Sequence, residues 1–298
     1  MEMKKVLVLT SGKKSKLTAF KLSKRNLNID LTTASFSDVY FDSDDREIFV
    51  KGAGNIADFD VLYFRLVGKS LETAALVAEY AKKNRVKIVD EIYAKSQVFP
   101  VTQSKAQEMK ALSDNHIAIP KTFFGSLTEI VKKSKEAFGF PFVIKSTSGS
   151  RGREVYSPKD NNDLKTLLAS LGKEEKSGKK FFAQEFISCT RRIRVLVVGG
   201  KILGSISQLT KWRKRVSGYT PKEDEKKIEK YVCTSEVKSL ALRAVKAVGL
   251  DIAGVDILID DETGKNYVIE VNAAPSWKLV KKYSGVNVEY EILKYISK

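Results

Sequence analysis

The chain has 298 residues, 43% of them hydrophobic, and its 53 basic and 36 acidic residues give a net charge of +17. This length and hydrophobic content predict a large core in about two domains, and with no apolar run resembling a signal peptide or a membrane span we expect a cytoplasmic protein. The two cysteines lack the spacing of metal ligands or of a disulfide framework, which argues against a zinc site and a disulfide scaffold. The single histidine argues against histidine-dependent nucleophilic catalysis.

The first third alternates short apolar segments with helical ones, which predicts an α/β unit. The pattern predicts strands at Val6–Leu9, Asp60–Arg65 and Val86–Asp90, and a helix over Leu71–Lys83. The turn at 10–15 superficially resembles a phosphate loop, but it lacks the upstream glycine of that motif, so we place no nucleotide there.

The middle of the chain predicts a small α+β unit. Its expected helices run over Lys105–Asn115, from a Ser126 capping box to Phe138, and over 161–171. Its expected strands lead toward Phe124 and lie at Phe142–Ser146 and at Phe181–Gln184. The last third predicts antiparallel pairs. Gly199-Gly200 joins strands Arg192–Val198 and Lys201–Ser207, a helix follows over 234–248, and a second hairpin joins Val255–Ile259 to Tyr267–Asn272.

The second hairpin places polar groups on apolar strands. If its turn is centred near Thr263, Asp256 and Glu270 are each seven residues away and face each other, with Cβ atoms about 5 Å apart. Asn272 shares the face of Glu270, because side chains alternate along a strand. Two carboxylates and an amide form an all-oxygen set suited to Mg²⁺, with Mn²⁺ as a substitute. The alternative is a pair of strand acids on a solvated face.

A candidate phosphate loop follows the strand that carries Lys145. Small residues follow it, and their amides could close over phosphate: Ser148, Gly149, Ser150 and Gly152. Lys105, on the preceding helix, is a weaker candidate, since a helix lysine in a lysine-rich chain is by default exposed. Glu185, Phe186 and Ile187 end the next strand and suggest a hinge whose main chain reads an adenine edge.

Arginines on the following strands suggest contact with an anion. Arg192 and Arg194 share one strand face, and Arg213 and Arg215 lie in a basic cluster with Trp212. The alternative is a ladder of charged residues on an exposed sheet face. For the scattered lysines we favour solvated surfaces over a dedicated phosphate-rich, acidic or RNA partner.

In this order and spacing the motifs resemble the ATP-grasp superfamily, and within it the RimK-type branch of ribosomal-protein glutamate ligases and related amino-acid ligases. The segments that carry the resemblance are 142–145 with 149–152, 184–187, 194–199, 253–258 and 269–275. The resemblance covers most of the chain, although the first third matches only in pattern.

The resemblance implies a mixed α/β and α+β chain with the ATP-grasp fold. It would comprise an N-terminal Rossmann-like pre-ATP domain (1–98), a central subdomain with the phosphate loop (99–187) and a C-terminal subdomain with the metal site (188–298). ATP would lie between the last two, with Lys105 and Lys145 near its phosphates, Glu185, Phe186 and Ile187 at the base, and Mg²⁺ on Asp256, Glu270 and Asn272.

The implied reaction activates a carboxylate as an acyl phosphate, which an amine attacks to give an amide, ADP and phosphate. Lys145, Arg194 and Arg213 would offset the repulsion between the reacting anions. The substrates would be an amino acid such as glutamate and a protein, peptide or cofactor, and the chain could self-associate. We expect Asp256→Ala and Glu270→Ala to abolish turnover and to leave the fold intact.

Four positions depart from the family pattern. Arg192 stands where relatives carry an aspartate for the ribose, Arg215 where Asn is frequent, Ser104 where an acid is common, and Trp277 where a small residue is frequent. These changes lie at the substrate end and suggest a substrate different from that of the named ligases. The alternative functions are an ATP-grasp kinase, and a non-catalytic ATP-binding or RNA-associated protein.

Overall fold

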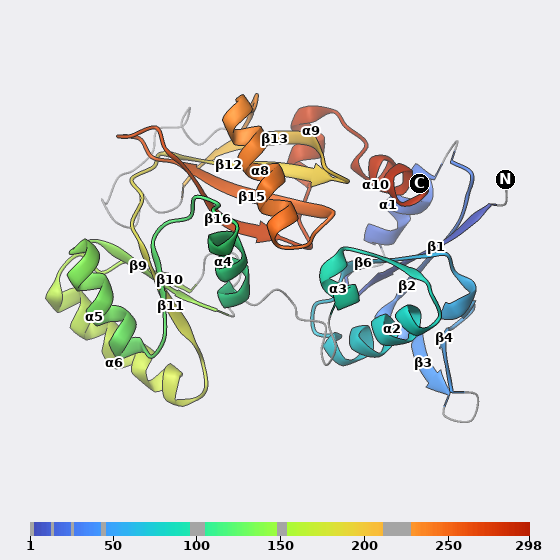
Figure 1. Cartoon of the computed structure of the whole chain (residues 1–298), viewed down its shortest axis with the longest axis horizontal. Helices are drawn as coiled ribbons and strands as arrows, with labels where there is room; N and C mark the ends of the chain where they lie inside the picture. Colours follow the sequence, from blue (N-terminus) through green and yellow to red (C-terminus); the bar gives the residue numbers. More distant parts are fainter. Residues whose placement is uncertain are drawn as a thin grey trace.

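The computed structural model describes residues 3–12, 15–24, 27–42, 46–95, 105–147, 154–210 and 228–298. Three large sheets organise them (Figure 1). Within this described part of the chain, every helix is too short or too polar to cross a membrane.

The N-terminal sheet is parallel and has the strand order β2-β1-β6-β7. Its strands are β1 (Lys4–Thr10), β2 (Ile29–Ser35), β6 (Val61–Leu66) and β7 (Lys87–Val89), and its helices are α1 (Ser15–Ser23), α2 (Leu71–Lys83) and α3 (Glu91–Lys95). A small antiparallel sheet of β3 (Val39–Asp42), β4 (Glu47–Val50) and β5 (Gly54–Asn55) lies between short 3₁₀ turns at Phe36–Asp38 and Ile56–Asp58. The carboxyl ends of β1, β6 and β7 share one edge, because the three strands run parallel.

The central sheet is antiparallel, in the order β10-β9-β11-β8. Its strands are β8 (Thr122–Phe124), β9 (Phe142–Ser146), β10 (Val155–Tyr156) and β11 (Phe181–Glu185). Helices α5 (Leu127–Phe138) and α6 (Asn161–Lys176) pack on it through an apolar cluster that includes Ile130, Phe142 and Leu164. The Ser126 hydroxyl accepts from the Glu129 amide and so begins α5 at the predicted residue.

The C-terminal sheet is antiparallel, in the order β14-β13-β12-β15-β16. Its strands are β12 (Arg191–Val198), β13 (Lys201–Leu209), β14 (Glu229–Lys230), β15 (Ile252–Ile259) and β16 (Asn266–Asn272). Helices α4 (Lys105–Asp114) and α8 (Ser235–Ala247) share one hydrophobic cluster with alternate β12 residues such as Val195.

The other face of this sheet packs on the N-terminal domain. Leu196 and Val198 of β12 join a cluster with Phe20, Trp277 and Val280, together with the C-terminal helices α9 (Lys278–Ser284) and α10 (Val288–Ile296). The N-terminal and C-terminal units therefore share a core. The predicted boundary at 98/99 lies outside the described residues, and the one at 187/188 falls between β11 and β12.

Most predicted elements are present. Helix α2 has the predicted bounds, α6 runs five residues further than predicted, and Gly199 and Gly200 have φ values of 54° and 73°, which suit a two-residue hairpin turn. The pattern did not predict α1, β2, the β3-β4-β5 sheet, α9 or α10. Strand β2 is threonine-rich and mostly half-buried, so its alternation is weak.

Candidate functional site

The second hairpin brings Asp256 and Glu270 together as predicted. They are directly paired across β15 and β16, and Asn272 pairs with Gly254 one step along the same face. A bulge follows Asp256, where the register shifts before Ile257. The geometric prediction from the turn is therefore confirmed, and the side chains lie on a face of the sheet that also carries arginine.

Asp256 is fully buried and is held by two arginines of the neighbouring strand. Arg194 lies directly opposite on β12 and donates from Nε to Oδ1 and from Nη2 to Oδ2, both at 2.8 Å. Arg192 lies farther off, with Nη1 3.3 Å from Oδ2. The hydrogen bonds to Asp256 raise the pKa of Arg194 further. The predicted anion partner of this arginine pair is thus, in this structure, a carboxylate of the same site.

Glu270 is held by Lys105 from helix α4. The Lys105 ammonium lies 2.7 Å from Glu270 Oε1 and 2.8 Å from Glu108 Oε2. Burial alone would lower the pKa of Lys105, but the two carboxylates outweigh it and raise that pKa above its ordinary value. Burial acts to raise the pKa of Glu270, and the Lys105 charge overcomes it and holds that pKa below its usual range. The default alternative, an exposed Lys105, does not describe this partly buried side chain.

Glu108 fastens α4 to the C-terminal sheet. Its side chain is only 1% exposed, its Oε1 accepts from the Val271 amide at 2.6 Å, and its Oε2 accepts from Lys105. Burial raises the pKa of Glu108 in spite of Lys105. Figure 1 shows α4 beside β16, away from the N-terminal helices. The sequence reasoning missed this residue, although its position four residues before the buried Leu112 was a usable signal.

Lys145 enters the same region from the central sheet. It is partly buried on β9, and its ammonium donates to Gln184 Oε1 on the adjacent strand β11. Burial lowers the pKa of Lys145 to about 8, Glu270 raises it, and Lys105 lowers it further. The Gln184 amide group donates in turn to Thr122 Oγ1 at 2.8 Å. Gln184 was predicted only as a strand residue, and its burial marks it as the support that orients Lys145.

The predicted hinge lies where β11 ends. Glu185 pairs its main chain with Lys121 and accepts from the Lys121 amide through Oε2 at 3.3 Å. Phe186 is partly buried, and Ile187 is buried in a small apolar cluster with Leu258, against which Tyr267 and Ile269 pack. An apolar cluster beside the end of a strand suits a flat heteroaromatic ring.

Several predicted site residues lie outside the described residues. They are Ser148, Gly149, Ser150 and Gly152 of the phosphate loop, and Arg213 and Arg215 of the basic cluster.

The donor set fits a hard divalent cation. Asp256, Glu270 and Asn272 offer oxygen ligands only, and one oxygen of Glu270 is not used by Lys105. The Asn272 side chain lies beside Glu270, whose pKa it helps to lower, so the amide oxygen of Asn272 would complete the donor set. Both oxygens of Asp256 are engaged by Arg194, so a bound cation would compete with that guanidinium or share the carboxylate with it.

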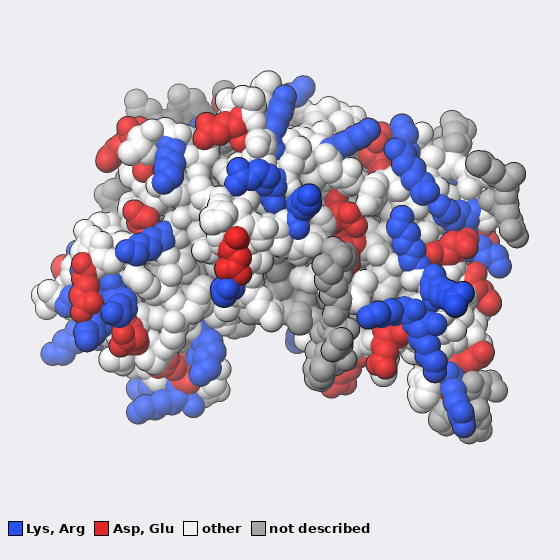
Figure 2. Space-filling model, viewed as in Figure 1, with Lys and Arg blue, Asp and Glu red and all other residues white. Residues whose placement is uncertain are grey.

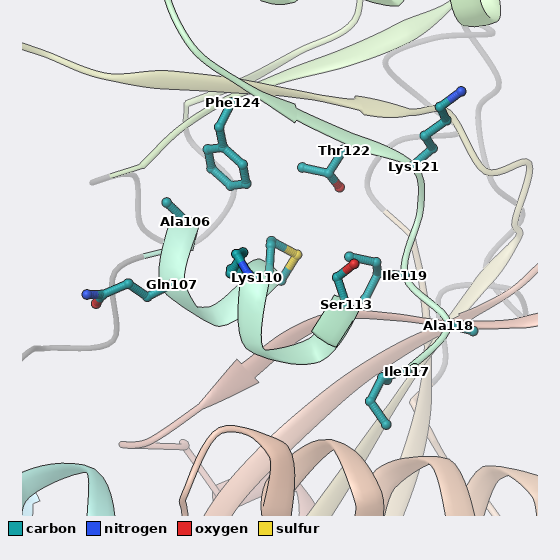
Figure 3. A pocket seen from close by; sticks show the side chains of 11 residues that line it. Ala106, Gln107, Lys110, Ser113, Ile117, Ala118, Ile119, Lys121, Thr122 and Phe124 are labelled. Carbon is teal, nitrogen blue, oxygen red and sulfur yellow. The ribbon is translucent and has the colours of Figure 1, made fainter. Parts of the chain in front are cut away.

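A pocket of about 720 Å³ lies between α4 and the segment that leads into β8 (Figure 3). Its wall includes Gln107, Lys110, Ser113 and Phe124, and none of the predicted site residues lines it. Met109 and Thr122 separate it from Gln184, because both contact that amide. The pocket is therefore adjacent to the Lys145 support and distinct from the place where the charged groups meet.

The charged surface is mixed on the face shown in Figure 2, where Lys and Arg lie among Asp and Glu over all three units. Such mixing is typical of a solvated surface, and the preference for solvated lysines over a dedicated partner stays a prediction.

Comparison with known proteins places these features in one family. The family model of the RimK-like ATP-grasp domain matches residues 102–296. A probable alpha-L-glutamate ligase of Haemophilus influenzae (strain PittEE) is 26% identical over 205 residues, which are 67% of this chain and 65% of the relative. The tetrahydromethanopterin:alpha-L-glutamate ligase of Methanocaldococcus jannaschii is 32% identical over 192 residues, 61% of this chain and 62% of the relative. The matches thus span less than two thirds of the length of these relatives.

Solved structures share the whole fold. The ATP-grasp ligase PsnB in complex with a minimal precursor, Mg and ADP has a TM-score of 0.74 at 18% identity, covering 98% of this chain and 97% of that chain. D-alanine–D-alanine ligase from Bacillus anthracis in complex with ATP has a TM-score of 0.64 at 17% identity, covering 98% and 96%. At these identities the likeness shows the fold alone. The predicted RimK-type resemblance and the ATP-grasp fold are confirmed.

Proposed function

Because the chain belongs to the RimK-like ATP-grasp family, we propose that it is a cytoplasmic ATP-dependent carboxylate–amine ligase that acts through an acyl phosphate. It joins an amino acid such as glutamate to a protein, peptide or cofactor. The observation that carries this proposal is the meeting of Lys145 from the central sheet with Lys105, Glu270 and Asp256 at the C-terminal sheet. Such a meeting of cations and oxygen ligands suits a nucleotide triphosphate with its metal.

The proposed role of each residue follows from where it lies in the site. Lys105 and Lys145 bind phosphate oxygens, together with the loop of Ser148, Gly149, Ser150 and Gly152. The main chain of Glu185, Phe186 and Ile187 binds the adenine edge. Asp256, Glu270 and Asn272 hold Mg²⁺, for which Mn²⁺ substitutes, and the ion supplies charge neutralisation at the phosphates when bound.

In the reaction a substrate carboxylate oxygen bonds to the γ-phosphorus, and the bond from that phosphorus to ADP breaks. The amine nitrogen then bonds to the acyl carbon, phosphate leaves, and the amine loses a proton. The first step brings two anions together, so the positive charges of Lys145, Arg194 and Arg213 lower its barrier. Arg192 of β12 would act at the substrate and sugar end, and Arg215, which lies outside the described residues, keeps its predicted role there.

The test is Mg²⁺-dependent ADP release across a panel of free amino acids, glutamyl peptides and basic peptides. We expect release that needs both an acid and an amine, and a loss of at least 10²-fold in Glu270→Ala. Glu262→Ala is the matched control, because Glu262 is exposed in the turn of the same hairpin. Undiminished release from Glu270→Ala would remove the metal assignment.

The other predicted functions give different products. A kinase would transfer the phosphate to a hydroxyl, so trapping of the acyl phosphate with hydroxylamine separates the two reactions. A non-catalytic or RNA-associated protein would bind ATP without ADP release, and RNA binding would weaken steeply with salt. Self-association and an acidic or RNA-associated partner stay predictions.

A further inference from the structure

Arg65 is a buried arginine that the proposed ATP site does not use. It is the fifth residue of β6, near the carboxyl end of that strand in the parallel N-terminal sheet. Ligands of open α/β sheets bind at this edge. The loops after β1 and β6 are tied together there, since the Ser11 amide donates to the Leu66 carbonyl at 2.7 Å and its hydroxyl to Ser70 Oγ at 2.8 Å.

The Arg65 side chain crosses to the C-terminal subdomain. Nη2 donates to the Pro275 carbonyl at 2.9 Å, and the guanidinium carbon lies 3.8 Å from the ring centroid of Trp277. Trp277 is itself held, because its Nε1 donates to Glu289 at 2.9 Å. Trp277, one of the departures from the family pattern, is thus the platform on which the guanidinium stacks.

The Arg65 guanidinium has N–H donors that make no hydrogen bond to the described residues. Arg65 is 4% exposed, and its Nε and Nη1 atoms have no hydrogen-bond partner among the described residues. The groups that act most strongly on its charge are the Tyr63 hydroxyl of the same strand and then Glu289, whose two oxygens already accept from Trp277 and from Lys281 at 2.7 Å. A buried cation without an anion is strongly unfavourable, so three unused N–H bonds in a fixed fork indicate a place for an anion from outside the protein.

The place is next to the proposed reaction centre. Pro275 follows Asn272 by three residues, a span of at most about 10 Å. It packs on Gly254, where an added Cβ would lie 2.8 Å from the Pro275 Cβ. Gly254 pairs with Asn272 and lies two residues before Asp256, on the same strand face. Arg65 therefore reaches the loop that leaves the metal ligands, from the side of the N-terminal domain.

We propose that Arg65 binds the α-carboxylate of the incoming amino acid, the carboxylate that is not phosphorylated. The inference rests on the proposed ligase function and names the part of the substrate that the N-terminal domain recognises. The α-carboxylate is adjacent to the amine that attacks the acyl phosphate, so a guanidinium fixed on Trp277 and Pro275 orients that amine. A planar fork matches a carboxylate in two bonds, which a lysine does not reproduce.

The test uses three probes that differ in one carboxylate: L-glutamate, L-glutamine, which keeps the α-carboxylate, and L-isoglutamine, which lacks it. Calorimetric titration into the full-length, nucleotide-free protein measures binding. We expect wild type to bind glutamate and glutamine at least about 30-fold more tightly than isoglutamine. Arg65→Met should lose this discrimination, Arg65→Lys should keep only part of it, and Arg243→Met, which changes an exposed arginine that also donates to a carbonyl, should keep all of it.

A merely structural role for Arg65 would weaken all three probes equally and leave their ratios unchanged. That outcome, or the same discrimination in Arg65→Met as in wild type, or no binding of any probe to wild type, would overturn the assignment. ADP release is measured separately on the same proteins. Discrimination that depends on Arg65 without ADP release would refute the ligase and would leave the carboxylate site in place.

Discussion

Arg194 and Asp256 face each other across β12 and β15 and form a two-bond ion pair, in which the carboxylate is fully buried and the guanidinium side chain is 21% exposed. The Arg194 guanidinium thus occupies both oxygens of a predicted metal ligand. The pair satisfies a charge that could not otherwise lie between Val255 and Ile257, both fully buried.

The first prediction concerns the stability of this pair. Asp256→Ala leaves Arg194 and Arg192 without their shared carboxylate, and Arg194→Met leaves the buried carboxylate with Arg192 alone, so each variant should lower the free energy of unfolding by about 3 kcal/mol. The double variant should lose less than the sum, which a double-mutant cycle by urea unfolding measures. Additive losses of stability would show that Arg194 and Asp256 do not stabilise each other. We expect Asp256→Ala to lower stability more than Glu270→Ala, because Glu270 is less buried, and the expectation that both variants keep the fold stays a prediction.

The second prediction concerns the pH dependence of nucleotide binding. Burial lowers the pKa of Lys145 to about 8, so the free protein holds this lysine charged below pH 8 and neutral above it. Bound phosphate favours the charged form, and the affinity for a non-hydrolysable ATP analogue should fall by up to about tenfold per pH unit above pH 8. Lys145→Met should bind weakly with little pH dependence from 7.5 to 9.5. The control is Lys179→Met, because Lys179 is paired instead with Glu154 and Glu174.

A third prediction concerns Asp90, which follows β7. Its Oδ1 accepts from the amides of Asp251 and Ile252 at 2.7 and 3.0 Å, and its Oδ2 has no partner among the residues that the structure describes. Burial raises the pKa of Asp90 to about 7, so the folded state binds this proton more tightly than the unfolded state, where the pKa is about 3.9. The bound proton contributes its full stabilisation below about pH 4. This contribution falls by up to about 1.4 kcal/mol per pH unit as the pH rises from about 4 to about 7.

Asp90→Asn keeps the Oδ1 acceptor and removes the charge. We expect it to be more stable than wild type at pH 8, with a difference that vanishes toward pH 4, as measured by urea unfolding at each pH. Asp163→Asn, an exposed change, should show no such trend. A constant difference between Asp90→Asn and wild type at every pH would refute the linkage.

The fourth prediction concerns Gly254. An alanine Cβ there would meet the Pro275 Cβ at 2.8 Å, so Gly254→Ala must displace the loop that follows Asn272. We expect a loss of about 1–3 kcal/mol in stability and a larger loss in Mg²⁺-dependent turnover. Gly172→Ala, in the middle of α6 with no atom within 4 Å of the new Cβ, should instead stabilise by up to about 1 kcal/mol. Equal stability of the two variants would show that the Pro275 contact is not tight.

Local patterns predicted a large part of this molecule. The Ser126 capping box, the glycine turn before β13 and the facing of Asp256 and Glu270 all depend on residues close in sequence, and the structure has them. Helix α1 was not predicted because its polar and apolar residues follow no helical face.

The partners of the charged groups could not be predicted from local pattern. Arg194 meets Asp256 only because β12 pairs with β15, across 62 residues of sequence, and strand order is a property of the whole fold. Arg65 and Pro275 are 210 residues apart. A buried arginine at the end of an apolar strand carries no mark of its partner, so its unused donors become visible only in three dimensions.

The Glu108 bond to Val271 has a consequence for how the central and C-terminal sheets can move against each other. It makes Lys105 part of the C-terminal body, while Lys145 belongs to the central sheet through Gln184. Any rotation of one sheet against the other changes the spacing of the two lysines and leaves Lys105 beside Glu270. The two lysines therefore lie on different sheets, and under the proposed function ATP would bring both ammonium groups to one chain of phosphates.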